Sequence, residues 1–138
     1  MPTPDAPLGG SCACGTVRYA VTAPFRTAGY CHCKRCQRRS GTMWTLNAMV
    51  DADAFEIVSG AESVNTWQPP DGHAKAFCTH CGGHVYSSGP GTVSVRLGTV
   101  DGDPGVRPRW RQWLESAPDW EPIPDDGLPR FAQRREID

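Results

Sequence analysis

The sequence predicts a single, mostly β domain of short antiparallel sheets with little helix, held together by a metal staple. Its 138 residues have room for one hydrophobic core. The 15 glycines and 13 prolines interrupt regular elements, which favours short strands over long helices. The seven cysteines are an odd number, so they cannot all pair as disulfides within the chain. Metal ligation or thiol chemistry accounts better than disulfides for so many cysteines in this chain.

The first nine residues are expected to form a flexible tail, followed by the folded domain at 10–138. The start, MPTPDAPLGG, has neither the basic stretch nor the apolar run of a signal peptide. No apolar run approaches the roughly 20 residues of a membrane-spanning helix. The expectation is therefore a cytoplasmic protein that does not associate with membranes, in a reducing compartment where disulfides are rare.

Alternating residues bounded by Gly, Pro, Asp or Ser predict the strands in order along the chain. In the run at 15–23, Val17, Tyr19 and Val21 share one face, and this period of two is typical of a half-buried strand. Further strands are expected at 43–50, 55–60, 63–68, 73–78, 84–89 and 92–100.

Helical patterns are short. A turn or two is expected at 34–41. A second candidate lies at 109–120, where Trp110, Trp113 and Leu114 follow helical spacing, but two prolines leave that assignment open. The sequence contains no linker that would divide the chain into two domains.

The cysteines fall into three groups, and their spacing predicts zinc. Cys78 and Cys81 form a Cys-x-x-Cys knuckle followed by two glycines, which aims two sulfurs at one ion. One such pair supplies half of a tetrahedral site, so a second pair must come from elsewhere. The remaining cysteines are Cys12 and Cys14, and then Cys31, Cys33 and Cys36.

Seven ligands divide naturally into four and three. Cys31, Cys33 and Cys36 could surround one ion, while the two remote pairs hold another; four thiolates make a closed site and three leave one corner open. A zinc ribbon of Cys33, Cys36, Cys78 and Cys81 fits the same spacing, which leaves both arrangements open. A second closed site would need an eighth ligand, such as His32 or His80.

Three ordered motifs carry a resemblance to a known family. The segments GSCACGTVRY, CHCKRCQRRSG and FCTHCGG, together with the ending APDWEPIPDDGLPRF, resemble the glutathione-dependent formaldehyde-activating enzyme family, which includes the centromere protein V type. The similarity runs from about Gly10 to Phe131. It implies a β-tent fold, in which antiparallel sheets carry zinc ligands at one end.

The resemblance also implies which cysteines share an ion. By position, Cys12, Cys14, Cys78 and Cys81 match the structural zinc ligands, and Cys31, Cys33 and Cys36 match the ligands of a second, catalytic zinc. The implied activity is that of a carbon–sulfur lyase acting on thiol–aldehyde adducts, such as S-hydroxymethylglutathione made from glutathione and formaldehyde. Its partners would be a small-molecule thiol, glutathione or another, and an aldehyde. The run RPRWRQW at 107–113 departs from the histidine-containing strand of the family.

A basic run surrounds Cys36 and has two interpretations. It could recognise carboxylates or phosphates, or it could balance the negative charge that thiolates leave around zinc. We favour charge balance because the run lies within the ligand loop. The run consists of Lys34, Arg35, Arg38 and Arg39.

Several other residues stand near the motifs. His32 lies between two ligands and is expected to point away from the metal, whereas His80 and His84 flank the knuckle and suit hydrogen bonds to the ligands. Trp44 follows the open site and could line a pocket, although aromatic residues in small β domains are more often core. The triplet at 125–127 is interpreted as a turn.

A non-catalytic zinc scaffold that binds a partner is the alternative function. It would use the basic run at 34–39, which could contact nucleic acid. The net charge of −1 provides no general attraction for nucleic acid, so this partner is not expected.

Overall fold

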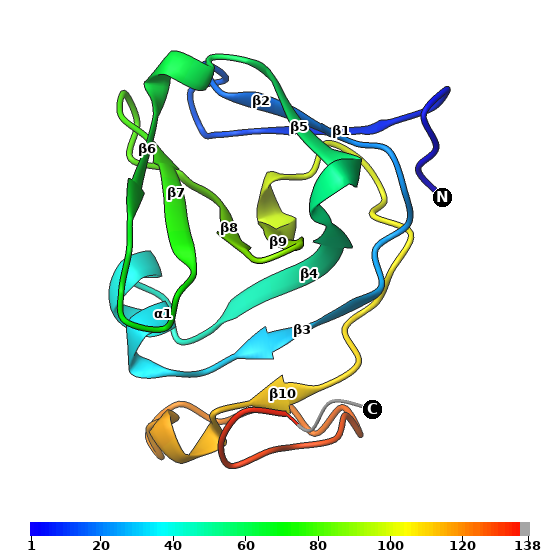
Figure 1. Ribbon diagram of the computed structural model, residues 1–138. Helices are drawn as coiled ribbons and strands as arrows, with labels where there is room; N and C mark the ends of the chain where they lie inside the picture. Colours follow the sequence, from blue (N-terminus) through cyan, green and yellow to red (C-terminus); the bar gives the residue numbers. More distant parts are fainter. Residues whose placement is uncertain (136–138) are drawn as a thin grey trace.

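A computed structural model describes residues 1–135 of the chain (Figure 1). None of the helices within this range is long and apolar enough to cross a membrane. The α-helix is α1 (Lys34–Ser40), and four short 3-10 turns accompany the strands. The strands are β1 (Leu8–Ser11), β2 (Arg18–Val21), β3 (Thr27–Cys31), β4 (Thr45–Asp51), β5 (Phe55–Ser59), β6 (Val64–Trp67), β7 (Ala74–Cys78), β8 (His84–Gly89), β9 (Thr92–Arg96) and β10 (Arg111–Gln112).

The strands form two sheets. A three-stranded antiparallel sheet has the order β1-β2-β5, and a seven-stranded sheet has the order β10-β3-β4-β9-β8-β7-β6. Figure 1 shows the small sheet across one end of the molecule, with the large sheet curving beneath it and the segment after β10 as the outermost layer at the other end. The neighbours pair antiparallel except β10, which runs parallel to β3.

The core contains side chains from both sheets. Val17, Tyr19 and Val21 are almost fully buried, as the alternation at 15–23 predicts. The Tyr19 ring lies 5.1 Å from the ring of Phe55, which lies 4.7 Å from that of Tyr86 on the large sheet. Burying a side chain of this kind contributes about 1.5–3 kcal/mol, so this contact between β2, β5 and β8 does much to hold the sheets together.

Strand β4 has two different faces. Ala48 and Val50 point into the core, where they are 0% and 1% exposed. Thr45, Asn47 and Met49 alternate with them and line a cavity on the other side of the sheet. One strand therefore supports the core and the cavity wall together.

One strand of the structure, β2 and then β4 to β9, lies within each of the ranges expected at 15–23, 43–50, 55–60, 63–68, 73–78, 84–89 and 92–100, except that β4 extends one residue further, to Asp51. Strands β1, β3 and β10 have no alternating pattern that predicts them. Strand β3 lacks large alternating side chains because the Trp110 ring fills the space beside Gly29. A Cβ atom on Gly29 would collide with this ring. The small residue makes room for a side chain from a distant segment.

The helix at 34–41 is confirmed as α1. Its N-cap is Cys33, whose sulfur accepts a hydrogen bond from the backbone of Cys36 at 3.3 Å. It ends at Gly41, whose φ of 69° is the left-handed conformation that glycine adopts easily.

The possible helix at 109–120 is wrong. This segment forms β10 and then a 3-10 turn at Leu114–Ser116, joined at Trp113 with a φ of 60°. Its backbone pairs with β3, with the amide of Tyr30 donating to the carbonyl of Trp110 at 3.0 Å. This tertiary pairing overrides a weak helical spacing.

The expected flexible tail at 1–9 does not match the structure. Strand β1 begins at Leu8 and pairs with Val21 of β2. Pro2 is buried, and Thr3 and Ala6 exchange two backbone hydrogen bonds of 3.2 Å. The segment is too short and too rich in proline to show a hydrophobic periodicity, so its sequence does not predict this turn.

Candidate metal centre and adjoining cavities

The first sulfur group joins two distant turns. Cys12 and Cys14 follow β1, whereas Cys78 ends β7 and Cys81 lies in the turn before β8. All four sulfurs lie within 4.8 Å of one another. The Sγ atom of Cys14 is 3.7 Å from that of Cys12 and 3.9 Å from that of Cys78. Ligands with metal–sulfur bonds of about 2.3 Å in a tetrahedron lie about 3.8 Å apart, so this group fits one tetrahedral ion.

Backbone amides face these sulfurs and favour thiolates. The amide of Val17 lies 3.3 Å from Cys12 Sγ, and that of His80 lies 3.4 Å from Cys78 Sγ. The amides of Cys14 and Gly83 donate to Cys81 and lower the pKa of its thiol to about 6. Donors at three of the four sulfurs prepare this group to bind a cation.

The second sulfur group comes from one short segment. Cys31 ends β3, Cys33 caps α1 and Cys36 lies in its first turn, with the three sulfurs within 4.8 Å of one another. Cys31 is 6% exposed and the other two are half-buried. Hydrogen bonds from the side chains of Cys31 and Cys33 hold the pKa of Cys36 well below its ordinary value. The geometry thus gathers three sulfurs without a fourth from the described part of the chain.

All three of these sulfurs line a cavity of about 590 Å³, called here the cysteine cavity. Its walls come from the outward-facing side of β4 and β9, the start of α1 and the segment after β10. Arg96 of β9 lies near the sulfurs and stabilises the thiolate of Cys36, and Arg39 adds a second nearby cation. The three-sulfur group therefore faces a cationic space large enough for a small molecule.

The alternative zinc ribbon of Cys33, Cys36, Cys78 and Cys81 does not form, because these sulfurs fall into two separate groups. Neither His32 nor His80 joins a group, so the described residues supply no eighth ligand. His84 lines the cysteine cavity without belonging to the sulfur cluster.

His32 is buried on the far side of the ligand loop. It is 1% exposed, and its Nε2 lies 3.3 Å from a guanidinium nitrogen of Arg111, which is itself 2% exposed. Burial and the charge of Arg111 lower the pKa of His32 to about 4. The expectation that His32 points away from the sulfurs is thus consistent with its contacts.

Trp44 packs beside His32 and Arg111 and lines neither the cysteine cavity nor the second cavity described below. Its ring centre lies 5.3 Å from that of His32 and 5.5 Å from the Arg111 guanidinium. Asp126, within the turn expected at 125–127, accepts a hydrogen bond of 2.8 Å from Arg111. Packing, and not a pocket, accounts for Trp44.

The basic run divides between different surroundings. Arg35 forms an ion pair with Asp71 at 2.8 Å, and Lys34 donates to the side chain of Gln37 at 3.3 Å. Lys34, Arg35 and Arg39 line the cysteine cavity, whereas Arg38 is exposed outside it. Three of the four basic residues therefore border the space beside the three sulfurs.

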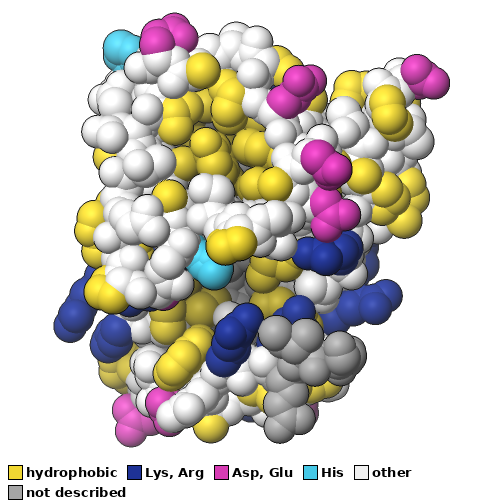
Figure 2. Space-filling model, in the orientation of Figure 1, with side chains coloured by type: hydrophobic (Ala, Val, Ile, Leu, Met, Phe, Trp, Pro, Cys, Tyr) yellow, Lys and Arg dark blue, Asp and Glu magenta, His cyan; other side chains and the backbone are white. Residues whose placement is uncertain are grey.

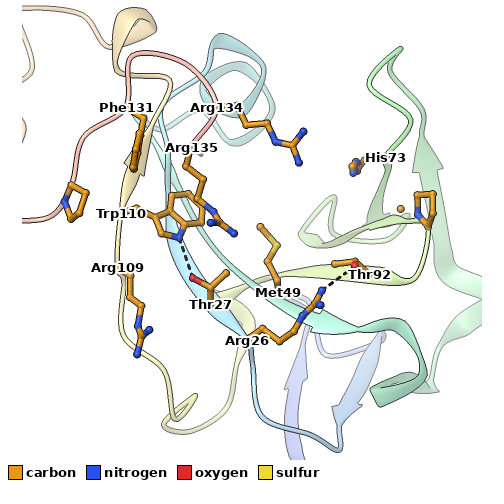
Figure 3. Close-up of a pocket in the computed structure, with 13 residues that line it drawn as sticks. Arg26, Thr27, Met49, His73, Thr92, Arg109, Trp110, Phe131, Arg134 and Arg135 are labelled. Atoms are coloured by element: carbon orange, nitrogen blue, oxygen red, sulfur yellow. Dashed lines mark hydrogen bonds between the residues drawn. The ribbon is translucent and has the colours of Figure 1, made fainter. Parts of the chain in front are cut away.

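A second cavity of about 740 Å³, called the arginine cavity, adjoins the first (Figure 3). Met49, His73, Thr92 and Arg134 line both. Figure 3 shows Met49 between Thr92 and the arginine-bearing C-terminal segment, with Arg109 pointing away. On the surface, Lys and Arg side chains gather in a band around a hollow (Figure 2). The segment at 107–113, which differs from the histidine-containing strand of the family, supplies part of the walls of both cavities. Its lining residues are Arg109, Trp110, Gln112 and Trp113.

Several polar residues line the site without any motif in the sequence that marks them. Thr45 and Asn47 of β4 and Arg96 of β9 line the cysteine cavity. The sequence does show that polar and apolar positions alternate along both strands. Which face of these strands lies toward the cysteines depends on the fold, and no local sequence pattern indicates it.

Comparisons with known proteins agree with these motifs. A family model described as glutathione-dependent formaldehyde-activating enzyme matches residues 7–116. A Halomonas elongata protein named "Putative glutathione-dependent formaldehyde-activating enzyme" is 31% identical over 130 residues, covering 84% of this chain and 80% of that protein. A crystal structure of a Rhodobacter sphaeroides protein, a structural genomics target, has a TM-score of 0.60 at 23% identity and covers 89% of this chain and 98% of its own. The last likeness concerns the fold alone.

Proposed function

The chain belongs to the glutathione-dependent formaldehyde-activating enzyme family, and from this premise we propose that it is a zinc-dependent enzyme of carbon–sulfur lyase type. Its reaction joins a thiol to an aldehyde or reverses that step. Glutathione and formaldehyde, which combine as S-hydroxymethylglutathione, are the substrates that the family description favours.

Cys12, Cys14, Cys78 and Cys81 would hold a structural zinc. Sulfur separations of 3.7 and 3.9 Å and the amides that face the sulfurs support this assignment. Four thiolates complete a tetrahedron, so this ion would leave no position for a substrate. Its role would be to join the turn after β1 to the turn between β7 and β8.

Cys31, Cys33 and Cys36 would hold a second zinc with an open position toward the cysteine cavity. When bound, zinc supplies an electrophilic centre that favours the thiolate form of a thiol near neutral pH. The single observation that carries the proposed function is that these three sulfurs line a cavity without a fourth ligand from the described residues.

The surrounding side chains suit an anionic thiol. Arg39, Lys75 and Arg96 line the cysteine cavity, and Arg134 lies where it meets the arginine cavity. Asp71 is the acidic residue of the described lining, and it is already paired with Arg35 and Lys75. These cations would bind the carboxylates of the thiol and orient its sulfur toward the cysteines.

The reaction itself needs no oxidant or reductant. A bond forms between the thiol sulfur and the aldehyde carbon, and the π electrons of the carbonyl move to its oxygen. The proton of the thiol ends on that oxygen, which becomes the hydroxyl group of the adduct. The reverse direction breaks the carbon–sulfur bond and returns both substrates.

The test combines zinc content with turnover. Protein purified without added metal should contain about two zinc ions per chain, by the count of closed and open sulfur groups. The exchange of glutathione with its formaldehyde adduct, followed by NMR, should be faster with the protein than without it. The Cys33→Ser variant should lose this acceleration and one zinc, yet unfold at the same temperature as the wild type.

Cys14→Ser is the matched control, since it removes a sulfur from the other group. It should lower the unfolding temperature along with the zinc content. Full acceleration in the Cys33→Ser variant, or none in the wild type across several thiol–aldehyde pairs, would contradict the proposed function.

A further inference from the structure

Asn47 carries the one buried side-chain oxygen or nitrogen in residues 1–135 that lacks a hydrogen-bond partner, its Oδ1 atom. The residue is only 7% exposed. Leaving such an acceptor unpaired costs about 1–3 kcal/mol, so its persistence indicates a partner that is absent from the chain itself.

The backbone holds this side chain against the cysteine cavity. Asn47 lies opposite Gly29 of β3 and opposite Arg96 of β9, so β4 is paired on both sides at this position. Adjacent residues of a strand point to opposite faces of the sheet. Because Ala48 faces the core, the Asn47 side chain faces the cysteine cavity. Pairing on both sides fixes the face of the sheet from which the Asn47 side chain projects.

The nitrogen end of the amide has a partner within the chain. Its Nδ2 group donates to Thr45 Oγ1 at 3.0 Å. Thr45 Oγ1 accepts this bond, and Oδ1 is the end of the amide that has no partner.

The rest of the cavity offers mainly donors. Arg96 donates to Ser87 Oγ at 2.8 Å, and Lys75 donates to Asp71 at 3.1 Å. Carboxylates of a ligand would find cations at several places on these walls. A hydroxyl group of a ligand near the three sulfurs would find Asn47 Oδ1 as an unused acceptor.

We propose that Asn47 Oδ1 accepts a hydrogen bond from the hydroxyl group of a bound thiol–aldehyde adduct and makes the site prefer the adduct over a thioether without that group. This rests on the proposed function and deepens it. The hydroxyl arises when the thiol proton moves to the former carbonyl oxygen, so the donor exists in the adduct and in neither substrate. Asn47 thereby distinguishes the adduct from the free thiol.

The test compares two ligands that differ by this hydroxyl. S-hydroxymethylglutathione, formed by mixing glutathione with formaldehyde, is compared with S-methylglutathione by calorimetric titration of the zinc-loaded protein. One uncharged hydrogen bond of about 0.5–1.5 kcal/mol predicts a preference for the adduct of about three- to tenfold. Asn47→Leu should reduce the preference to about one while the affinity for S-methylglutathione stays within about twofold, because only the acceptor is removed.

Ser94→Ala is the control variant. Ser94 lies on the same cavity wall, 3.5 Å from a guanidinium nitrogen of Arg96, and its loss should leave the preference intact. If Asn47→Leu does not fold, Asn47→Ala provides the same comparison, and zinc content verifies that the sulfur groups are preserved.

Two results would overturn the inference alone. One is a wild type that binds both ligands equally, as expected if Oδ1 is satisfied by water. The other is an Asn47 variant that keeps the preference. A wild type that binds neither ligand and accelerates no exchange overturns the proposed function itself, and the role of Asn47 with it.

Discussion

Arg111 donates to Asp126 Oδ2 at 2.8 Å from a position in which its side chain is nearly buried. The same guanidinium lies 4.0 Å from the ring centre of Tyr30, so it contacts β3 and the C-terminal segment together. The pair therefore fastens the segment that follows β10 behind the loop that carries Cys31, Cys33 and Cys36.

This pair predicts a pH dependence. The hydrogen bond from Arg111 lowers the pKa of Asp126, so the folded chain keeps this carboxylate ionised at a lower pH than the unfolded chain does. The pair stabilises the fold above the pKa of an unfolded aspartate, about 3.9, and this stability is lost as the pH falls through the lowered pKa. In urea unfolding, the difference between wild type and Asp126→Asn should be constant above about pH 5 and shrink below about pH 4.

Asp125→Asn is the control for this experiment, because Asp125 is exposed and is not the residue that binds Arg111. Its stability should follow that of the wild type at every pH. A stability difference between wild type and Asp126→Asn that grows as the pH falls would contradict a lowered pKa of Asp126.

Gly29→Ala should destabilise the protein by about 1–3 kcal/mol, the usual cost of overpacking. The added Cβ would collide with the Trp110 ring, which is 5% exposed and held by a hydrogen bond from its Nε1 to Thr27. Gly102→Ala is the matched control, since a Cβ there meets no atom within 4 Å. Thermal unfolding measures both, and equal midpoints would exclude the packing role of Gly29.

The sequence was most informative where a local pattern was enough. The alternation at 15–23 predicted the buried face of Val17, Tyr19 and Val21, and the spacing at 34–41 predicted α1. Strand β3 escaped prediction because its packing partner Trp110 lies about 80 residues away in the chain. The family resemblance separated the cysteines into the same two groups that the sulfur positions form.

Zinc removal should occur in two stages. A chelator should first take the ion from Cys31, Cys33 and Cys36, which offer three ligands and face a cavity, without unfolding the protein. Removal from the four-sulfur group should coincide with loss of the fold, because that ion would join distant turns. Parallel measurement of released zinc and circular dichroism checks the order, and simultaneous unfolding with the first ion would contradict it.

Arg134 should contribute to the affinity for an anionic thiol. It is exposed and lines both cavities, so Arg134→Ser should weaken glutathione binding about two- to fivefold, the range of a solvent-screened charge pair. Added salt should reduce the difference. Arg18→Ser removes the same charge at a residue that pairs with Asp101 and lines neither cavity, and it should not change binding. Equal losses in the two variants would indicate a general charge effect.

The cavity itself could not be predicted from the sequence. Asn47 looks like an ordinary polar residue of a half-exposed strand, and only the pairing of β4 with β3 and β9 reveals a buried oxygen beside the sulfurs. Arg111 likewise belongs to a segment whose spacing suggested a helix. Long-range pairing decides both cases, and local periodicity carries no information about it.

The two sulfur groups differ in when a growing chain can assemble them. Cys31 to Cys36 is complete within six residues, whereas the other group needs both Cys12 and Cys81. By loop-closure entropy, bringing the longer segment together costs about 2 kcal/mol more. During synthesis, the three-sulfur group is therefore available to capture an ion before β8 exists. A metal ion in the four-sulfur group would therefore report that the domain has folded, while an ion in the other group would report only that one loop has been made.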